Sequence, residues 1–226
     1  MLYLLALVVF LVLMVLPGWW ANAVLRRHAG ERAEFTHTGA SLARRLLGEQ
    51  GLTEVRVEIT EQGDHYDPSS RTVRLSAANY QGRSLTALTV AAHEVGHALQ
   101  HQAGYQPLTW RTRLVRVAQG AEKLGAVLML ITPVFMLLAR RPGGGLVTAL
   151  IGAAGFLSAA LVHLVTLPVE FDASFRRALP LLKLDVLEPR DLPAARRILT
   201  ACALTYVAAS LSAMLNLWRW LAILRR

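Results

Sequence analysis

The chain has 226 residues, of which 54% are hydrophobic and only 17% are charged. Soluble domains carry about 25% charged residues, so this composition predicts a small integral membrane protein with a modest polar domain. It excludes a disordered or collagen-like chain, and the single cysteine, Cys202, excludes an intramolecular disulfide framework or a cysteine-rich zinc cluster.

The net charge of +9 comes from 24 Lys and Arg residues against 15 Asp and Glu residues. Nucleic-acid binding would need these cations on one stripe interleaved with aromatic residues. Instead they come in pairs beside apolar runs, as the positive-inside bias of membrane proteins produces. We therefore expect a lipid bilayer, and no nucleic acid, as a partner. The pairs are Arg26–Arg27, Arg140–Arg141, Arg176–Arg177 and Arg225–Arg226.

The first apolar stretch, Leu2 to Trp20, has no charge and is long enough to cross a bilayer. It predicts an N-terminal transmembrane anchor over residues 1–25. The alternative is a cleaved signal peptide, because Ala21-Asn22-Ala23 resembles a cleavage site. However, no Lys or Arg precedes the run, while Arg26 and Arg27 follow it, which favours the uncleaved anchor.

Three more apolar stretches follow, at Leu124 to Ala139, Leu146 to Pro168 and about Ile198 to Trp218. The first two are joined by a Pro-Gly-Gly-Gly turn, so residues 123–168 are predicted to form a transmembrane hairpin. The last predicts a C-terminal transmembrane helix over 198–226. Most Lys and Arg residues lie between the anchor and the hairpin or between the hairpin and the last helix, so these polar segments are expected to face the cytoplasm.

The polar domain, residues 26–122, has a mixed α+β pattern. Ser41 to Leu47 predicts a short helix that ends near Gly48. Glu54 to Ile59 alternates polar and apolar residues, as a half-buried strand does, and Thr72 to Leu75 predicts a second strand after a turn. Ser84 to Gln102 predicts a helix with Ser84 as its N-cap.

That last helix carries the H-E-x-x-H pattern His93-Glu94-Val95-Gly96-His97. Residues four apart lie on one face of a helix, so the two imidazoles can bind one zinc ion. The glutamate beside them can accept the proton of a zinc-activated water. An exposed helix face with ordinary polar residues is the alternative, but the flanking residues are apolar, and ionisable groups on a buried helix need partners.

A catalytic zinc needs a third protein ligand. His101 lies one turn beyond His97 but roughly 12 Å along the axis from His93, too far for one ion. Glu170 is the better candidate, because the predicted hairpin returns the chain to the side that carries the two histidines. Alternatively, Glu170 is a boundary carboxylate paired with Arg176 or Arg177.

The chain resembles the YugP-like neutral zinc metallopeptidases of bacterial membranes. The resemblance rests on the H-E-x-x-H helix, on residues 64–76 with Asp64-His65-Tyr66-Asp67-Pro68, and on residues 167–174 with Pro168-Val169-Glu170-Phe171-Asp172-Ala173-Ser174. It also extends to the order of the apolar segments and covers nearly the whole chain.

The resemblance implies a peptidase of the bacterial plasma membrane that depends on one zinc ion. It implies His93 and His97 as metal ligands and Glu94 as the catalytic base. Glu170 matches the third ligand of the wider H-E-x-x-H, E-x-x-A-D class. Ser174 stands where that class often has Asp, so either Ser174 or Asp172 is expected to support a ligand.

Three further residues carry weaker signals. His163 lies within an apolar stretch, where an ionisable residue is a functional candidate or a histidine hydrogen-bonded between helices. His65 and Tyr66 are candidates for binding substrate or for donating to the oxyanion; the alternative is a role in the turn before Pro68.

We therefore expect a mainly α-helical membrane protein with about four transmembrane helices and a small α+β zinc peptidase domain. Residues 169–197 would carry the third ligand. The expected activity is endopeptidase cleavage of peptide or protein substrates, membrane-associated ones included. The alternatives are a non-catalytic zinc-binding scaffold, which would not need Glu94, and an intramembrane protease, which the polar residues at both ends of the motif helix disfavour.

Overall fold

The computed structural model describes residues 2–118, 120, 162 and 165–205. Two compact units divide the chain. One combines residues 1–105 with 167–208, and the other combines 106–166 with 209–226. In the second unit, residues 106–118 are helical, and Thr112 Oγ1 donates to the carbonyl of Leu108.

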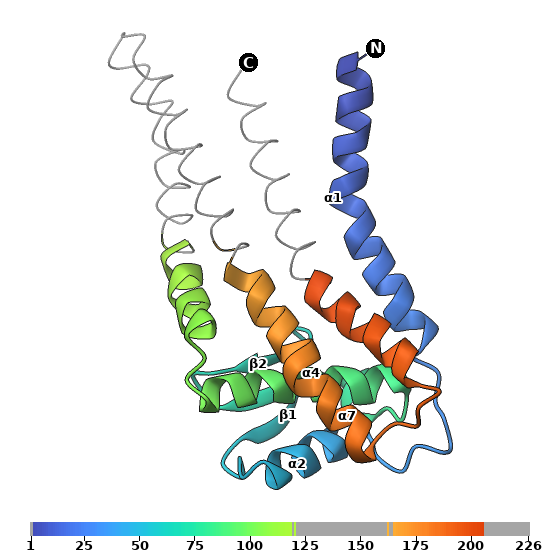
Figure 1. The fold of residues 1–226 in the computed structure, drawn as a ribbon, viewed down its shortest axis with the longest axis vertical. Helices are drawn as coiled ribbons and strands as arrows, with labels where there is room; N and C mark the ends of the chain where they lie inside the picture. Colours follow the sequence, from blue (N-terminus) through green and yellow to red (C-terminus); the bar gives the residue numbers. More distant parts are fainter. Residues whose placement is uncertain (1, 119, 121–161, 163–164, 206–226) are drawn as a thin grey trace. The chain divides into compact units, whose positions relative to one another are not determined.

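The first unit holds most of the described elements (Figure 1). Its helices are α1 (Leu2–Arg27), α2 (Gly39–Glu49), α3 (Ala77–Gln81), α4 (Leu85–Gln102) and α7 (Leu179–Asp185), with the π-helix η1 (Asp172–Ala178) directly before α7. Its strands are β1 (Arg56–Thr60), β2 (His65–Asp67) and β3 (Thr72–Ser76). Residues 165–171 and 192–205 are also helical.

The three strands form one mixed sheet in the order β1-β3-β2. β1 runs parallel to β3, with Val57 opposite Val73. β2 runs antiparallel to β3 and forms an edge of the sheet. Val73 and Leu75 of the central strand are fully buried, so this strand anchors the sheet in the core.

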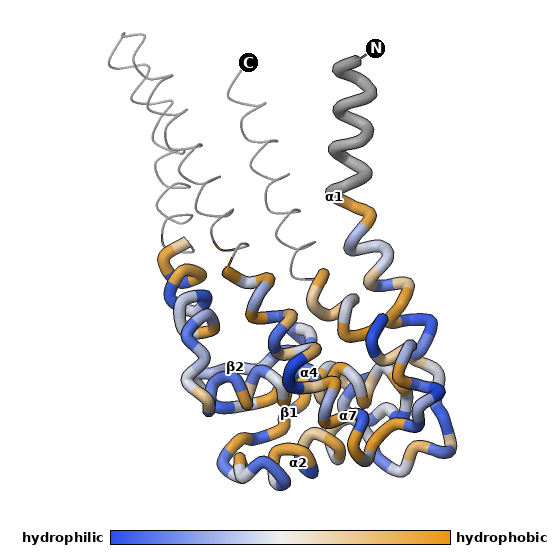
Figure 2. Tube along the Cα trace, in the orientation of Figure 1, coloured by the Kyte–Doolittle hydropathy of each residue, from blue (hydrophilic) through white to orange (hydrophobic). Residues whose placement is uncertain are grey.

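α2 shows why these segments fold against the sheet. Thr38 and Ser41 form a reciprocal capping box at its N-terminus. Its buried residues are mostly apolar, whereas its exposed or half-buried face carries Arg44 and Arg45. Figure 2 shows the same alternation of hydrophobic and hydrophilic residues along the helix. The prediction of a helix over Ser41 to Leu47 is confirmed. The observed helix is longer than predicted by two residues at each end.

The prediction of about four transmembrane helices is wrong. Among the residues that the structure describes, no helix combines the length and the apolar content that crossing a bilayer requires. The stretch 124–139 and most of 146–168 and 198–218 lie outside the described residues. What the structure shows is a mainly helical α+β fold with a three-stranded mixed sheet.

The C-terminal turns of α1 show a physical reason for this correction. Ala21 is fully buried, and Val24 and Leu25 pack against the core of the domain. The carbonyl of Leu25 accepts a hydrogen bond from Thr86 Oγ1 at 2.8 Å, at the start of α4. The last residues of the predicted anchor therefore pack on protein, whereas Val15, Leu16 and Trp19 of the apolar run are exposed.

Candidate metal centre

α4 directs both motif histidines into the interior of the domain. Ser84 caps the helix by accepting a hydrogen bond from the Ala87 amide, as its sequence predicts, and nearly every residue up to Ala98 is buried. His93 and His97 lie one turn apart on the same face, with ring centroids separated by 4.7 Å.

Glu170 meets the two histidines from a distant part of the sequence. It belongs to the helical segment 165–171 and is fully buried. Its Oε2 atom lies 3.2 Å from Nε2 of His93 and 3.3 Å from Nε2 of His97. One ligand atom from each of these three residues lies within 4.8 Å of the others. The structure thus brings together the three residues that the sequence predicts as ligands.

Gly96 explains how the two elements come so close. A Cβ atom at this position would lie 2.5 Å from the carbonyl oxygen of Ala173, closer than van der Waals contact permits. α4 and η1 therefore touch through backbone at this point. η1 is a π-helix, a rare form that occurs frequently at functional sites.

The electrostatics of the group favour an ionised carboxylate. Burial by itself raises the pKa of Glu170, because it disfavours the charged form. When the neighbouring imidazoles of His97 and His93 are protonated, they outweigh burial and hold the pKa of Glu170 below its usual range. The site therefore presents an anionic oxygen beside two ring nitrogens.

These three side chains fit a zinc ion. Tetrahedral zinc with ligand bonds of about 2.0–2.1 Å separates its ligand atoms by roughly 3.3 Å, which is the spacing between Oε2 of Glu170 and Nε2 of each histidine. Within the described part of the chain, the buried Nε2 atoms of His93 and His97 have no hydrogen-bond partner. Buried polar atoms normally have one, so an ion between them accounts for their arrangement. Two histidines and a glutamate are also a known ligand set of catalytic zinc.

The opposite ring nitrogens of the histidines are hydrogen-bonded. Ser174 Oγ lies 3.0 Å from Nδ1 of His93 and donates its proton to the carbonyl of Leu199 at 3.3 Å, so its oxygen accepts from the imidazole. Gln100 Oε1 lies 3.0 Å from Nδ1 of His97. In both rings Nε2 is then the unprotonated nitrogen, the form that binds a metal.

A model of the family described as "Putative neutral zinc metallopeptidase" matches residues 3–225. The chain belongs to this family. It is also similar to the "Putative membrane protease YugP" of Bacillus subtilis (strain 168), with 37% identity over 216 residues, which are 91% of each protein. No solved structure matches the chain significantly. The zinc in the family's description agrees with a His-His-Glu group that is able to hold a metal ion.

The other residues predicted for the site lie elsewhere or outside the described residues. Tyr66 is on β2, and its hydroxyl lies 2.8 Å from Nδ1 of His101; burial raises the pKa of Tyr66 to about 12. Nδ1 of His65 lies 2.8 Å from the Gly63 carbonyl. His163 lies outside the described residues. Asp172 is near the group, but its carboxylate accepts hydrogen bonds from Gln100 and Arg177.

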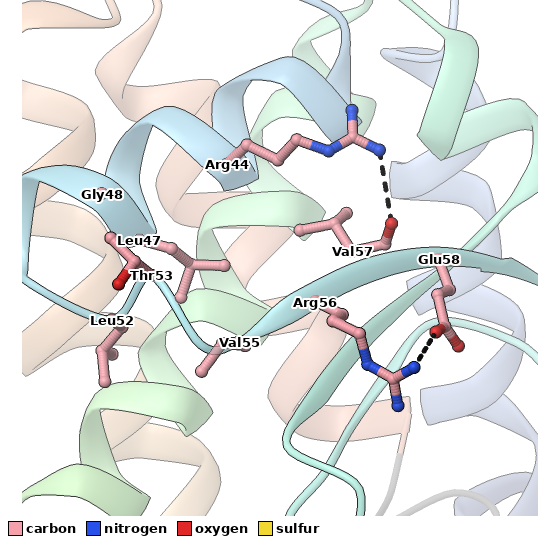
Figure 3. A pocket seen from close by; sticks show the side chains of 9 residues that line it. All are labelled: Arg44, Leu47, Gly48, Leu52, Thr53, Val55, Arg56, Val57 and Glu58. Carbon is pink, nitrogen blue, oxygen red and sulfur yellow. Dashed lines mark hydrogen bonds and ion pairs between the residues drawn. The ribbon is translucent and has the colours of Figure 1, made fainter.

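A cavity of about 530 Å³ in the same unit is lined by residues of α2, of β1 and of the loop between them (Figure 3). Its charged side chains are paired with neighbours. Arg44 donates to the carbonyl of Val57, and Arg56 lies 3.3 Å from Glu58. None of the described residues that line it belongs to the His-His-Glu group.

Gln100 is the residue of this site that the sequence does not single out. Its position three residues after His97 places both residues on one helix face. That spacing is the sequence signal that could have identified Gln100 as part of the site. A glutamine near the end of a helix is usually a surface residue, whereas Gln100 is fully buried.

Proposed function

We propose that this chain is a zinc-dependent endopeptidase whose metal ligands are His93, His97 and Glu170 and whose general base is Glu94. The observation that carries the proposal is the buried group of two histidines and one carboxylate, within 4.8 Å of one another, formed by an H-E-x-x-H helix and a segment distant in sequence. Membership of a zinc metallopeptidase family supports it.

The roles follow from where each side chain lies. His93 and His97 offer Nε2, and Glu170 offers a carboxylate oxygen, so the three would hold the ion on one side. A zinc ion bound there would acidify a water molecule and polarise the substrate carbonyl. Glu94 follows His93 directly and is 2% exposed. We assign it the proton transfer, first from the attacking water and then to the leaving amine.

Glu94→Gln tests the mechanism. The substitution removes the base and leaves all three ligands in place, so the purified full-length protein should keep its zinc and lose peptide hydrolysis by at least about 100-fold. The assay uses a peptide blocked at both ends, which only an endopeptidase cleaves. Glu61→Gln is the matched control, because it makes the same change at an exposed position.

The outcomes separate the alternatives. Wild-type protein that binds zinc and cleaves no peptide would be a zinc-binding scaffold. Cleavage of unblocked peptides alone would indicate an exopeptidase. Glu94→Gln protein with the wild-type rate would reject Glu94 as the base.

We extend the location in the relative's name, a membrane protease, to this chain. The proposal is a bacterial protein associated with the plasma membrane, with the catalytic unit on the cytoplasmic side. It acts on peptide or protein substrates, membrane-associated ones included. Fractionation should recover the protein with membranes, and a protease added to intact spheroplasts should leave residues 60–80 uncut. Cleavage there without lysis would place the unit outside.

A further inference from the structure

Gln100 connects two metal-ligand segments through a single buried amide group. Its Oε1 lies 3.0 Å from Nδ1 of His97, three residues earlier on α4. Its Nε2 donates to the carbonyl of Val169 at 2.7 Å and to Oδ2 of Asp172 at 2.9 Å. Val169 immediately precedes Glu170, so the same side chain touches one ligand and the backbone beside another.

The network leaves only one orientation for this amide. A backbone carbonyl can only accept hydrogen bonds, and the Asp172 carboxylate, which already accepts from Arg177, serves as an acceptor too. The NH₂ group of Gln100 must therefore face Val169 and Asp172, and its oxygen must face His97. That oxygen can only accept, so His97 carries its proton on Nδ1 and directs the lone pair of Nε2 toward Glu170.

The π-helix places Asp172 where this network needs it. Arg177 Nε donates to Oδ2 of Asp172 at 2.8 Å, a pair five residues apart that corresponds to one π-turn. The Leu179 amide bonds the Ser174 carbonyl with the same five-residue spacing. With a regular α-helical turn, the residue above Asp172 would be Arg176, so the wider turn selects the arginine that holds the carboxylate.

We propose that Gln100 is the positioning residue of the metal centre: it fixes the tautomer of His97 and ties the Glu170 segment to α4 in one ligand geometry. This inference rests on the proposed zinc site. Ser174 supports His93 alone, whereas Gln100 acts on His97 and on the backbone next to Glu170 at once. Asp172 and Arg177 keep the amide in its orientation.

The test measures metal binding, so it does not depend on peptidase activity. Gln100→Leu keeps the approximate volume and removes all three hydrogen bonds. In full-length protein, competition with a chromogenic chelator should show zinc affinity about 10–100-fold lower than wild type. The cobalt-substituted protein should show an altered visible spectrum, because the ligand geometry changes. Gln102→Leu makes the same substitution at an exposed position of α4 and should leave both measurements unchanged.

Two variants of Asp172 provide a second test, which remains valid even if the Gln100→Leu protein does not fold. Asp172→Asn retains an oxygen that can accept from both Gln100 and Arg177, so zinc affinity should stay within about threefold of wild type. Asp172→Leu removes that acceptor and should weaken zinc binding about tenfold or more. A merely structural role would lower the stability of the metal-free protein without changing the cobalt spectrum.

The results separate the two proposals. If wild-type protein binds no zinc, the proposed function fails. If wild-type protein binds zinc and folded Gln100→Leu protein keeps the same affinity and cobalt spectrum, the positioning role of Gln100 is overturned. Equal losses in Asp172→Asn and Asp172→Leu would also overturn it, because they would show that the charge of Asp172 matters and its acceptor geometry does not.

Discussion

A fully buried carboxylate such as Glu170 is costly unless charged or polar groups compensate it. Here two unprotonated imidazole nitrogens lie within 3.3 Å of one of its oxygens, so a cation bound between the three atoms would supply the compensating charge. If Glu170 were only a boundary residue paired with an arginine, it would be exposed, and its pair would contribute little. Its burial beside His93 and His97 favours the ligand role.

Glu170→Gln exchanges an anionic ligand for a neutral one, whereas Ser174→Ala removes no ligand but only the hydrogen bonds to His93 and to the carbonyl of Leu199. We expect Glu170→Gln to lower zinc affinity by more than 100-fold and Ser174→Ala to lower it by about 10–100-fold. Chelator competition on both purified variants measures the difference. Full zinc content in Glu170→Gln would mean that another residue is the third ligand.

Asp67 provides a pH-dependent contribution to stability away from the metal centre. The hydrogen bond from Arg74, at 2.8 Å, and the one from Ser70 hold the pKa of Asp67 below its usual range. Because the native pKa lies below the unfolded value of about 3.9, the stabilisation is complete above that value and is lost as pH falls toward the native pKa. Asp67→Asn should therefore lower the free energy of unfolding by about 1–2 kcal/mol at pH 7.

Urea unfolding at pH 7 and pH 3 checks this prediction. The gap between wild type and Asp67→Asn should narrow at pH 3, because Asp67 of the unfolded wild-type chain takes up a proton there while the native carboxylate stays ionised. A gap of equal size at both pH values would contradict the assigned role of the Asp67 carboxylate.

At the scale of elements, α4 and η1 form the site because they meet at a glycine. Gly96→Ala would place a methyl group 2.5 Å from the Ala173 carbonyl. Such overpacking costs about 1–3 kcal/mol, which exceeds the gain in helix propensity of about 1 kcal/mol. We expect Gly96→Ala to lower both the free energy of unfolding and the affinity for zinc.

Gly48→Ala in α2 is the matched control. No described atom would lie within 4 Å of its new Cβ, so the helix propensity gain of up to about 1 kcal/mol should appear as increased stability, with zinc binding unchanged. Denaturant unfolding and chelator competition measure both effects. Equal behaviour of the two variants would show that the contact between Gly96 and Ala173 does not set the geometry of the site.

Features that depend on nearby residues could be predicted from the sequence. The cap and length of α4, two of the three strands and the face shared by His93 and His97 follow from local patterns. The sequence pattern does not predict β2, because its three residues lie beside turn residues and form a strand only by pairing with β3. The role of Gln100 depends on Val169 and Asp172, about 70 positions away, and no local pattern shows that contact.

The prediction of transmembrane helices failed for a related reason. Composition and hydropathy count apolar residues but do not show which surface covers them. Ala21, Val24 and Leu25 at the end of α1 pack on the core of the domain, a contact that hydropathy alone cannot distinguish from contact with lipid.

At the scale of the whole unit, the His93, His97 and Glu170 group joins two distant parts of the chain, 1–105 and 167–208. A second link joins the same parts: Arg32 contacts Asp191 through two hydrogen bonds, at 2.7 and 3.1 Å. A ligand that binds only the folded state stabilises it by mass action. A zinc ion held by residues from both parts should therefore stabilise the entire unit.

We expect chelation of zinc to lower the melting temperature of the wild-type protein. Free zinc at 100 times its Kd contributes about 2.7 kcal/mol, which corresponds to a shift of about 5–10 °C for a unit of this size. In Glu170→Gln the shift should nearly vanish, because zinc no longer links the two parts. Asp191→Asn, the control, weakens the second link and should lower the melting temperature equally with and without zinc. Calorimetry of the three proteins in zinc and in chelator measures this, and a wild-type melting temperature that chelation leaves unchanged would contradict a zinc ion shared between the two parts.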